Sequence, residues 1–237
     1  MNEQQTLSVL GRVGMIITNS HVVHTSDKHG SAYIINKDAL YPHVRETSML
    51  CLEIAERFAD DKVEAVIAPA VGGAILAQWV AYHLIKITGR DIPGVYVEKE
   101  MTSFRHPDSI GKMELPIKSA YEETGRFAFK QGCDQVITGK RVLVVGNVLI
   151  TGDSVRKTVS ATHNIDANII GLGVLCNCGG VFPAEYLNVP RLEALANVNL
   201  ETWNEEDCPL CKQGVPINPD VGYGRMYLGR RAVTQDL

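Results

Sequence analysis

The sequence predicts an α/β fold in which a mostly parallel sheet is flanked by helices. The first observation behind this prediction is that short, β-branched apolar runs recur along the chain, with helical stretches between them. The second is that these runs lack strict alternation of polar and apolar residues, which indicates strands covered on both faces. The third is size and composition: 237 residues, 45% hydrophobic and 21% charged, suit one globular domain with a full core.

Helices and strands alternate in the predicted order. The helix expected over Val44–Phe58 is amphipathic, with one apolar stripe between charged residues. Because no period is sustained from about residue 100 to 138, or beyond Trp203, we expect irregular structure there. The expected elements are a helix over Val44–Phe58, a strand over Val63–Ala68, a helix over Ala74–Ile87, strands over Gly94–Val97 and Arg141–Val145, a helix over Ser154–Thr162 and a strand over Asn168–Leu175.

Charge and hydropathy exclude several classes of protein. The net charge of −4 gives no excess of basic residues that would favour binding to nucleic acid or to an anionic membrane. Met1–Leu10 is polar and does not read as a secretory signal. Ala65–Ile85 contains no charged residue, but Pro69, Gly72 and Gly73 divide it into a strand, a turn and a helix, so we expect no membrane span. We therefore expect a cytoplasmic protein.

The strongest functional signal is the stretch Arg141–Val155. Its apolar run, Val142–Val145, reads as a buried strand, and the polar sequence Thr151-Gly152-Asp153-Ser154 then opens the next helix. A strand that leads through a loop into a helix presents free backbone N–H groups and the positive end of the helix dipole. This arrangement predicts a phosphate-binding site.

Two further segments are consistent with phosphate. Ala70-Val71-Gly72-Gly73 is a strand-to-helix turn whose glycines let a ligand approach the backbone, although a tight turn that packs the helix on the sheet explains them equally well. Glu98-Lys99-Glu100 ends a strand, where Lys99 is either a solvated side chain or a cation that contacts phosphate.

In this order the segments resemble the type I phosphoribosyltransferases, in which a buried strand is followed by two acidic residues and a Thr-Gly phosphate loop. Val144–Ser154 matches that pattern in everything except the acidic pair. The resemblance is closer to the orotate phosphoribosyltransferase-like branch. It includes the base-enclosing segment Thr25–Asn36, the start of the flap at Val97–Glu100, and the tail Trp203–Pro216.

The resemblance implies transfer of ribose 5-phosphate from phosphoribosyl pyrophosphate (PRPP) to a nitrogenous base, with Mg²⁺ bound to PRPP and release of pyrophosphate. It also implies a single domain over residues 1–237, with a core over about 20–200, a flap over about 100–138, a small hood that includes the tail 203–237, and a homodimer. By this resemblance, the residues that bind the 5-phosphate are Thr151, Gly152, Asp153 and Ser154, and those that bind the pyrophosphate are Val71, Gly72, Gly73 and the catalytic Lys99. The residues that face the ribose are Asn147 and Val148, and those that bind the base are Lys28, Tyr33, Ile34 and Ile150.

The sequence departs from this family at three places. Gly146-Asn147 replaces the acidic pair, so the ribose contacts are neutral. Ile150 replaces a small or hydroxyl residue, and Cys176-Asn177-Cys178 follows the last strand without the arginine that pairs the orotate carboxylate. The sequence therefore does not identify the base. A second hypothesis, besides that of an enzyme, is a non-catalytic PRPP- or nucleotide-binding regulatory protein on the same fold.

The cysteines suggest a possible metal site. Six cysteines in a cytoplasmic chain argue against a disulfide framework. The two close-spaced pairs, Cys176 with Cys178 and Cys208 with Cys211, predict a four-thiolate zinc site, and a third hypothesis is a zinc-stabilised scaffold with a vestigial phosphate loop. The alternative is that these are small buried residues at a strand end and in a tight Cys-Pro turn.

Histidine offers weaker signals. His29 lies in the base-enclosing segment, where it either touches substrate or is a solvated loop residue, and His106 lies in the flap. The other five of the seven histidines, including His21, are interpreted as structural.

Overall fold

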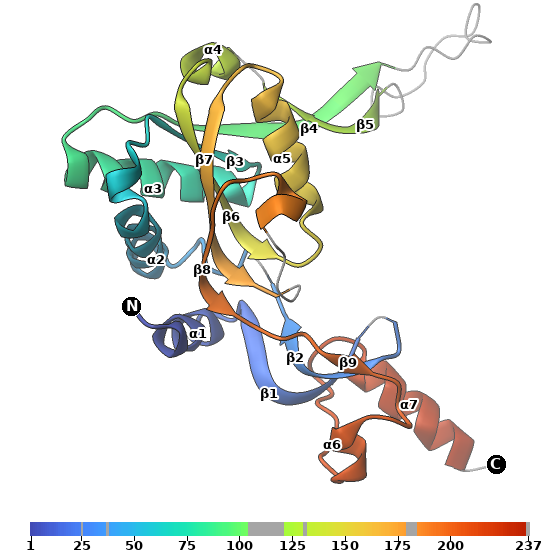
Figure 1. The fold of residues 1–237 in the computed structure, drawn as a ribbon. Coiled ribbons are helices and arrows are strands. Elements are labelled where there is room, and N and C mark those ends of the chain that lie inside the picture. The colour runs from blue at the N-terminus through green and yellow to red at the C-terminus, as the bar shows by residue number, and fades with distance from the viewer. Residues whose placement is uncertain (25, 37, 104–120, 130–131, 179–183, 236–237) are drawn as a thin grey trace, which may run out of the picture.

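The structure is a computed structural model, which describes residues 1–24, 26–36, 38–103, 121–129, 132–178 and 184–235. Its main body is built on a six-stranded sheet with the order β5-β4-β3-β6-β7-β8 (Figure 1). The pairs β4/β3, β3/β6, β6/β7 and β7/β8 are parallel, and only the edge pair β4/β5 is antiparallel. The strands are β3 (Ala65–Pro69), β4 (Gly94–Ser103), β5 (Tyr121–Ala128), β6 (Arg141–Leu149), β7 (Asn168–Asn177) and β8 (Leu192–Asn197).

Helices cover both faces of this sheet. The helices of the main body are α1 (Glu3–Arg12), α2 (Val44–Arg57), α3 (Gly72–Thr88), α4 (Cys133–Ile137) and α5 (Asp153–His163), with short 3-10 turns at Ala59–Asp61 and Ala184–Leu187. One hydrophobic cluster includes side chains of α1, α2 and α3, and a second includes those of α5. Figure 1 shows α2 and α3 on one side of the sheet and α5 on the other.

The apolar runs of the sequence are explained by these two clusters. In β3, Val66 and Ala68 belong to the first cluster, whereas Ala65 and Ile67 belong to the second. Successive side chains of a strand point to opposite faces, so a strand that is covered on both faces must be apolar at every position. The α/β fold with a mostly parallel, helix-flanked sheet is thus the one that the sequence predicted.

A smaller lobe, which we call the hood, is set off from the main body (Figure 1). It consists of a three-stranded sheet with the order β1-β2-β9 and two helices near the C-terminus. An isolated bridge between Val23 and Gly222 ties β1 to the segment before the last helix. The hood elements are β1 (Ile16–Val23), β2 (His29–Ile34), β9 (Thr202–Trp203), α6 (Pro209–Lys212) and α7 (Gly224–Gln235).

Several elements differ from the sequence-based expectation, which did not include β1, β2, α4, β8, β9 or α6. The region expected to be an irregular flap begins and ends as the antiparallel hairpin of β4 and β5, while residues 104–120 lie outside the described residues. Helix α7 occupies part of the tail that was expected to be loop-like. Helix α1 was not predicted, although its capping box, in which Asn2 and Gln5 exchange hydrogen bonds, is readable from the Asn-x-x-Gln spacing.

The long uncharged segment does not form one continuous helix. It is divided into β3, a turn and α3, and within the described part of the chain no helix is long and apolar enough to cross a membrane.

The close packing of β7 against α2 gives a stability prediction. A Cβ atom added at Gly173 would lie 2.6 Å from Cγ2 of the buried Ile54 and 3.4 Å from Cε2 of Phe58. We expect Gly173→Ala to lower the free energy of unfolding by about 1–3 kcal/mol, because the packed core must shift to admit the methyl group. Urea denaturation of both proteins measures this difference.

The matched control is Gly146→Ala on the adjacent strand. A Cβ atom there would lie 3.6 Å from Cγ1 of Val174, which is ordinary van der Waals contact. We expect a change below about 1 kcal/mol for this variant. Equal losses in both variants would contradict the packing described for β7.

Candidate active site

A cavity of about 370 Å³ lies at the carboxyl ends of β3 and β6. It is lined by Asp38, residues 69–73 and residues 146–155. The chain runs from β3 outward to β4 on one side and from β6 outward to β7 and β8 on the other. The crevice between two such strands is the usual place for a ligand in an open parallel sheet, because the connections leave it in opposite directions.

Two helix N-termini open onto this cavity. Helix α3 begins at Gly72 and helix α5 at Asp153, and both residues are among the lining residues. The first backbone N–H groups of a helix have no intrahelical partner, and the helix dipole adds partial positive charge there. Within the described part of the chain, neither N-cap residue, Val71 or Gly152, makes a side-chain capping hydrogen bond. The cavity is therefore suited to two anionic groups.

The loop before α5 has a conformation that requires glycine. Gly152 has a φ of 76°, and a Cβ atom there would lie 2.7 Å from Cδ2 of Leu187. The hydroxyl of Thr151 accepts a hydrogen bond of 3.4 Å from the N–H of Asp153, and the side chains of Thr151 and Ser154 are exposed. The structure thus brings all four predicted 5-phosphate residues, 151–154, to the wall of the cavity.

The turn before α3 also depends on glycine. A Cβ atom at Gly72 would lie 2.7 Å from the hydroxyl oxygen of Tyr41 and 2.8 Å from Oδ1 of Asp38. The glycine therefore lets the segment 38–41 pack against the start of the helix. The peptide bond between Ala70 and Val71 is cis, and the side chain of Val71 is 85% exposed. The three predicted pyrophosphate residues 71–73 all line the cavity.

Asn147, which stands where the family has an acidic residue, is held by hydrogen bonds on both sides. Its Nδ2 donates to the hydroxyl of Tyr41 over 3.2 Å, and its Oδ1 accepts from the N–H of Val148 over 2.8 Å. Burial, together with the nearby Asp38, raises the pKa of Tyr41, and the hydrogen bond from Asn147 opposes this only partly. The phenol is therefore neutral at physiological pH and retains its O–H donor.

Asp38 and Tyr41 were missed by the sequence analysis. The only local signal is a turn in which Oδ1 of Asn36 accepts a hydrogen bond of 2.9 Å from the N–H of Asp38. Their proximity to Gly72 and Asn147 comes from contacts across long sequence separations, which no local pattern reveals.

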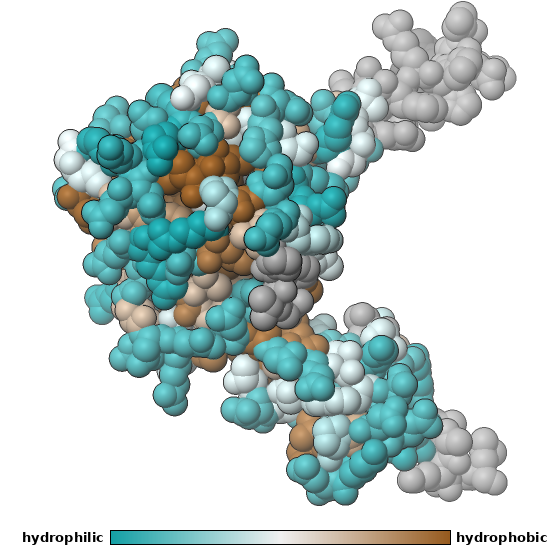
Figure 2. All heavy atoms as spheres, viewed as in Figure 1, coloured by the Kyte–Doolittle hydropathy of each residue, from teal (hydrophilic) through white to brown (hydrophobic). Residues whose placement is uncertain are grey.

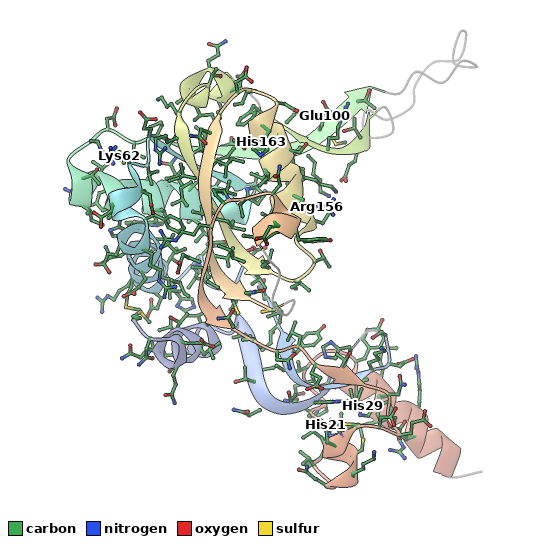
Figure 3. The ribbon with its side chains drawn as sticks, in the orientation of Figure 1. His21, His29, Lys62, Glu100, Arg156 and His163 are labelled. Carbon is green, nitrogen blue, oxygen red and sulfur yellow. The ribbon has the colours of Figure 1, made fainter. Side chains whose placement is uncertain are left out.

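Four of the predicted substrate-binding residues are not among the described lining residues of the cavity: Lys99, Tyr33, Lys28 and Ile34. Lys99 projects from the β4–β5 hairpin, where its Nζ lies 2.8 Å from Oε1 of Glu123 and both side chains are exposed. Figure 3 labels the adjacent Glu100 on this hairpin. Tyr33 packs on His24 in the hood, with ring centroids 5.3 Å apart.

The remaining predicted base-binding residues are divided between two places. Ile150 lines the cavity and is 45% exposed. Ile34 packs against the first hydrophobic cluster, and Lys28 is an exposed residue of the hood. His106 lies outside the described residues.

The structure places the two cysteine pairs of the expected zinc site in different parts of the molecule. Cys176 and Cys178 lie at the end of β7, with sulfur atoms 3.2 Å apart, and belong to the first hydrophobic cluster of the main body. Cys208 and Cys211 lie in the hood, around α6. The hydrogen bond shared with Cys178, followed by burial, raises the pKa of Cys176, as expected for a thiol in an apolar core.

Comparison with known proteins identifies the class. The model of the phosphoribosyl transferase domain matches residues 45–181, and the chain belongs to this family. The orotate phosphoribosyltransferase of Desulforamulus reducens is 31% identical over 216 residues, which cover 91% of this chain and 95% of that protein. The enzyme of the same name from Pelotomaculum thermopropionicum is 30% identical over the same shares of both chains.

A solved structure shares the fold. The orotate phosphoribosyltransferase of Mycobacterium tuberculosis superposes with a TM-score of 0.54 at 17% identity, over 81% of this chain and 95% of that one. These comparisons confirm the predicted fold and the prediction of a phosphoribosyltransferase enzyme, and they do not favour the non-catalytic alternative.

The anionic character of the ligand gives a testable prediction at the start of α5. We expect Ser154→Glu to weaken PRPP binding at least about tenfold, because a carboxylate at the helix N-terminus repels phosphate in a partly desolvated site. Isothermal titration calorimetry measures the dissociation constant.

Ser160→Glu is the matched control, since Ser160 is another exposed serine of α5 and is not among the described lining residues of the cavity. We expect its dissociation constant to stay within about twofold of the wild-type value, because an exposed charge almost two helical turns farther from the cavity is screened. Equal weakening by both variants would show that net charge, rather than the N-terminus, governs binding.

Proposed function

We propose that this enzyme transfers the ribose 5-phosphate of PRPP to a pyrimidine base of the orotate class and releases pyrophosphate. The observation that carries the proposal is one cavity onto which the N-termini of α3 and α5 both open. PRPP carries a phosphate at one end and a pyrophosphate at the other, so a pair of anion sites matches it. The pyrimidine acceptor is supported by the orotate phosphoribosyltransferases that match over nearly the whole chain.

The proposed reaction forms a bond between a ring nitrogen of the base and C1 of the ribose, while the bond between C1 and the pyrophosphate oxygen breaks. The electron pair of that bond leaves with pyrophosphate, and the sugar passes through a cationic, oxocarbenium-like state. The proton that the ring nitrogen carried is released to solvent. Backbone N–H groups of residues 151–154 would hold the 5-phosphate, and those of residues 71–73 would stabilise the charge that develops on pyrophosphate. The amide of Asn147 and the backbone of Val148 would face the ribose.

Mg²⁺ is the metal that the family implies, and the donor set of the cavity fits it. The described lining residues include two carboxylates, of Asp38 and Asp153, and Mg²⁺ prefers oxygen ligands and keeps several waters. Oδ2 of Asp153 lies 2.8 Å from Nζ of Lys157, which leaves Asp38, beside the pyrophosphate turn, as the side chain that would hold the hydrated ion. Bound Mg²⁺ would neutralise charge on the leaving pyrophosphate.

Lys99 is proposed as a further pyrophosphate ligand. Its present partner, Glu123, forms an exposed ion pair with it, and such pairs contribute only about 0–1 kcal/mol. Exchange of Glu123 for a phosphate oxygen would therefore cost little. A homodimer, which the resemblance implies, and a cytoplasmic location, which we expect from the sequence, complete the proposal.

The choice of base gives the decisive test. Among the described residues that line the cavity, the charged ones are Asp38 and Asp153, and both are acidic. A carboxylate on the base would gain no charge-assisted hydrogen bond there, a contact worth about 1.5–3 kcal/mol. We therefore expect orotate and uracil to be used with kcat/KM values within about tenfold of each other.

Pyrophosphate release from PRPP and Mg²⁺ in the presence of orotate, uracil, adenine or no base measures this. Turnover with adenine alone, or tight PRPP binding without turnover on any base, would contradict the proposed function. A preference for orotate above about a hundredfold would leave the transferase intact and show that a cation outside the described lining residues pairs the carboxylate.

The position of Asn147 gives a second test. If its side chain faces the ribose, Asn147→Asp should strengthen Mg²⁺-dependent PRPP binding by about fivefold, because a carboxylate accepts stronger hydrogen bonds from hydroxyl groups than an amide does. Calorimetry with and without Mg²⁺ reports the change.

Asn168→Asp is the control for charge, since Asn168 is exposed at the amino end of β7, whereas the cavity lies at the carboxyl ends of the strands. It should leave the dissociation constant of PRPP unchanged. If the dissociation constant of PRPP is also unchanged in Asn147→Asp, the assignment of Asn147 to the ribose is wrong.

A further inference from the structure

Four potential metal ligands meet in the hood, away from the active-site cavity. They come from three parts of the chain: His21 from β1, His29 from β2, and Cys208 and Cys211 from the start of α6. The ligand atoms of all four lie within 4.8 Å of one another. Figure 3 shows His21 and His29 side by side in the hood, next to α6. His21, His29 and Cys208 are buried, and Cys211 is partly buried.

Three of four distances within this cluster fall in the range expected for the edges of a tetrahedron around one ion, and the fourth is shorter. Nε2 of His21 lies 2.9 Å from Nδ1 of His29, 3.6 Å from Sγ of Cys208 and 3.7 Å from Sγ of Cys211. Sγ of Cys211 lies 3.3 Å from Nδ1 of His29. Zinc bonds of about 2.0–2.3 Å to nitrogen and sulfur give tetrahedral edges of about 3.3–3.8 Å, so only small shifts are needed.

The orientation of His21 is already the one that a metal requires. Its Nδ1 lies 2.7 Å from the carbonyl oxygen of Val215, which can only accept, so Nδ1 carries the proton. In the neutral ring, Nε2 then presents a bare lone pair toward His29 and the two sulfur atoms. A hydrogen bond from the distal nitrogen to a backbone carbonyl is the usual support of a metal-bound histidine.

The cysteine segment has the spacing of a zinc knuckle. Cys208 and Cys211 are separated by two residues, and Pro209 starts the short helix between them. The chain then folds back, because the N–H of Val215 donates to the carbonyl of Leu210 over 2.9 Å. This turn brings the carbonyl of Val215 to His21, so the same segment supplies two ligands and the support of a third.

Only part of the hood packs on the main body: Ile16 of β1 and Ala32 of β2 belong to the first hydrophobic cluster. The buried valines of the hood, Val22, Val23 and Val221, belong to neither of the two hydrophobic clusters found among the described residues. In Figure 2 the hood is a separate lobe whose visible surface is mostly hydrophilic. Small units without a sufficient apolar core commonly depend on a metal or on disulfides.

We propose that His21, His29, Cys208 and Cys211 bind one structural zinc ion, which ties the β1–β2 hairpin to the C-terminal segment. Four protein ligands close the coordination sphere, so no position is left for water or substrate and the role is structural rather than catalytic. This ligand set differs from the four cysteines expected from the sequence, since the two histidines take the place of Cys176 and Cys178.

Metal analysis of the full-length protein, purified without chelator, tests the proposal. We expect about one zinc per chain by inductively coupled plasma mass spectrometry. Cys211→Ser and His29→Ala should each lower zinc affinity by about a hundredfold or more, since loss of even an outer-shell partner costs 10–100-fold. The matched controls, Cys133→Ser and His163→Ala, alter a partly buried and an exposed residue of the main body and should retain full zinc.

Cobalt titration keeps the test valid if a ligand variant folds poorly. Demetallated wild-type protein titrated with Co²⁺ should develop the intense visible bands of tetrahedral cobalt and a thiolate-to-cobalt charge-transfer band, both saturating at about one ion per chain. Weak octahedral bands, zinc content below about a tenth per chain, or a Cys208–Cys211 disulfide in the freshly purified protein would overturn the proposal.

Discussion

The arrangement of this enzyme depends on the burial of both faces of β3 and β6. Because Val66 and Ala68 pack on one hydrophobic cluster and Ala65 and Ile67 on the other, the strand cannot shift by one residue without exchanging its two faces. This fixed register places the carboxyl ends of β3 and β6 side by side, and α3 and α5 therefore begin at the same edge of the sheet. The anion-binding character of the cavity follows from this backbone arrangement rather than from any single charged side chain.

Much of the main body was readable from the sequence because its signals are local. Helix α2 was predicted almost to its observed ends, and β6 was recognised although it continues beyond Val145 through Gly146 and Asn147, which are poor strand formers. The hairpin strand β5 and the helix α7 were not predicted. β5 is an edge strand with polar side chains such as Glu123 and Arg126, so no apolar run marks it. Helix α7 contains glycine within its span and has a weak amphipathic pattern.

The same difference between local and long-range signals explains which residues of the candidate site were predicted from the sequence. The loop 151–154 and the turn 71–73 were found because glycine and N-cap chemistry are written in a few consecutive residues. Asp38 and Tyr41 escaped notice because only the folded chain brings them to Gly72 and Asn147. The cysteine pairs show the same limit: the spacing of Cys208 and Cys211 indicated a metal, but their partners come from a hairpin nearly the whole chain away.

The short segment that follows β2 leads from the hood to the cavity, and it is anchored on the first hydrophobic cluster, away from the proposed zinc ligands. The N–H of Ile35 donates to the carbonyl of Met15 over 3.0 Å, and Met15 is buried in the first hydrophobic cluster. Farther along, Leu40 belongs to the same cluster, and its carbonyl accepts a hydrogen bond of 2.9 Å from the hydroxyl of Thr47. Asp38 lies between these two anchors. Loss of the proposed zinc would therefore loosen the hood while Asp38 and Tyr41 stay in place, so metal binding and PRPP binding are separable properties of this fold.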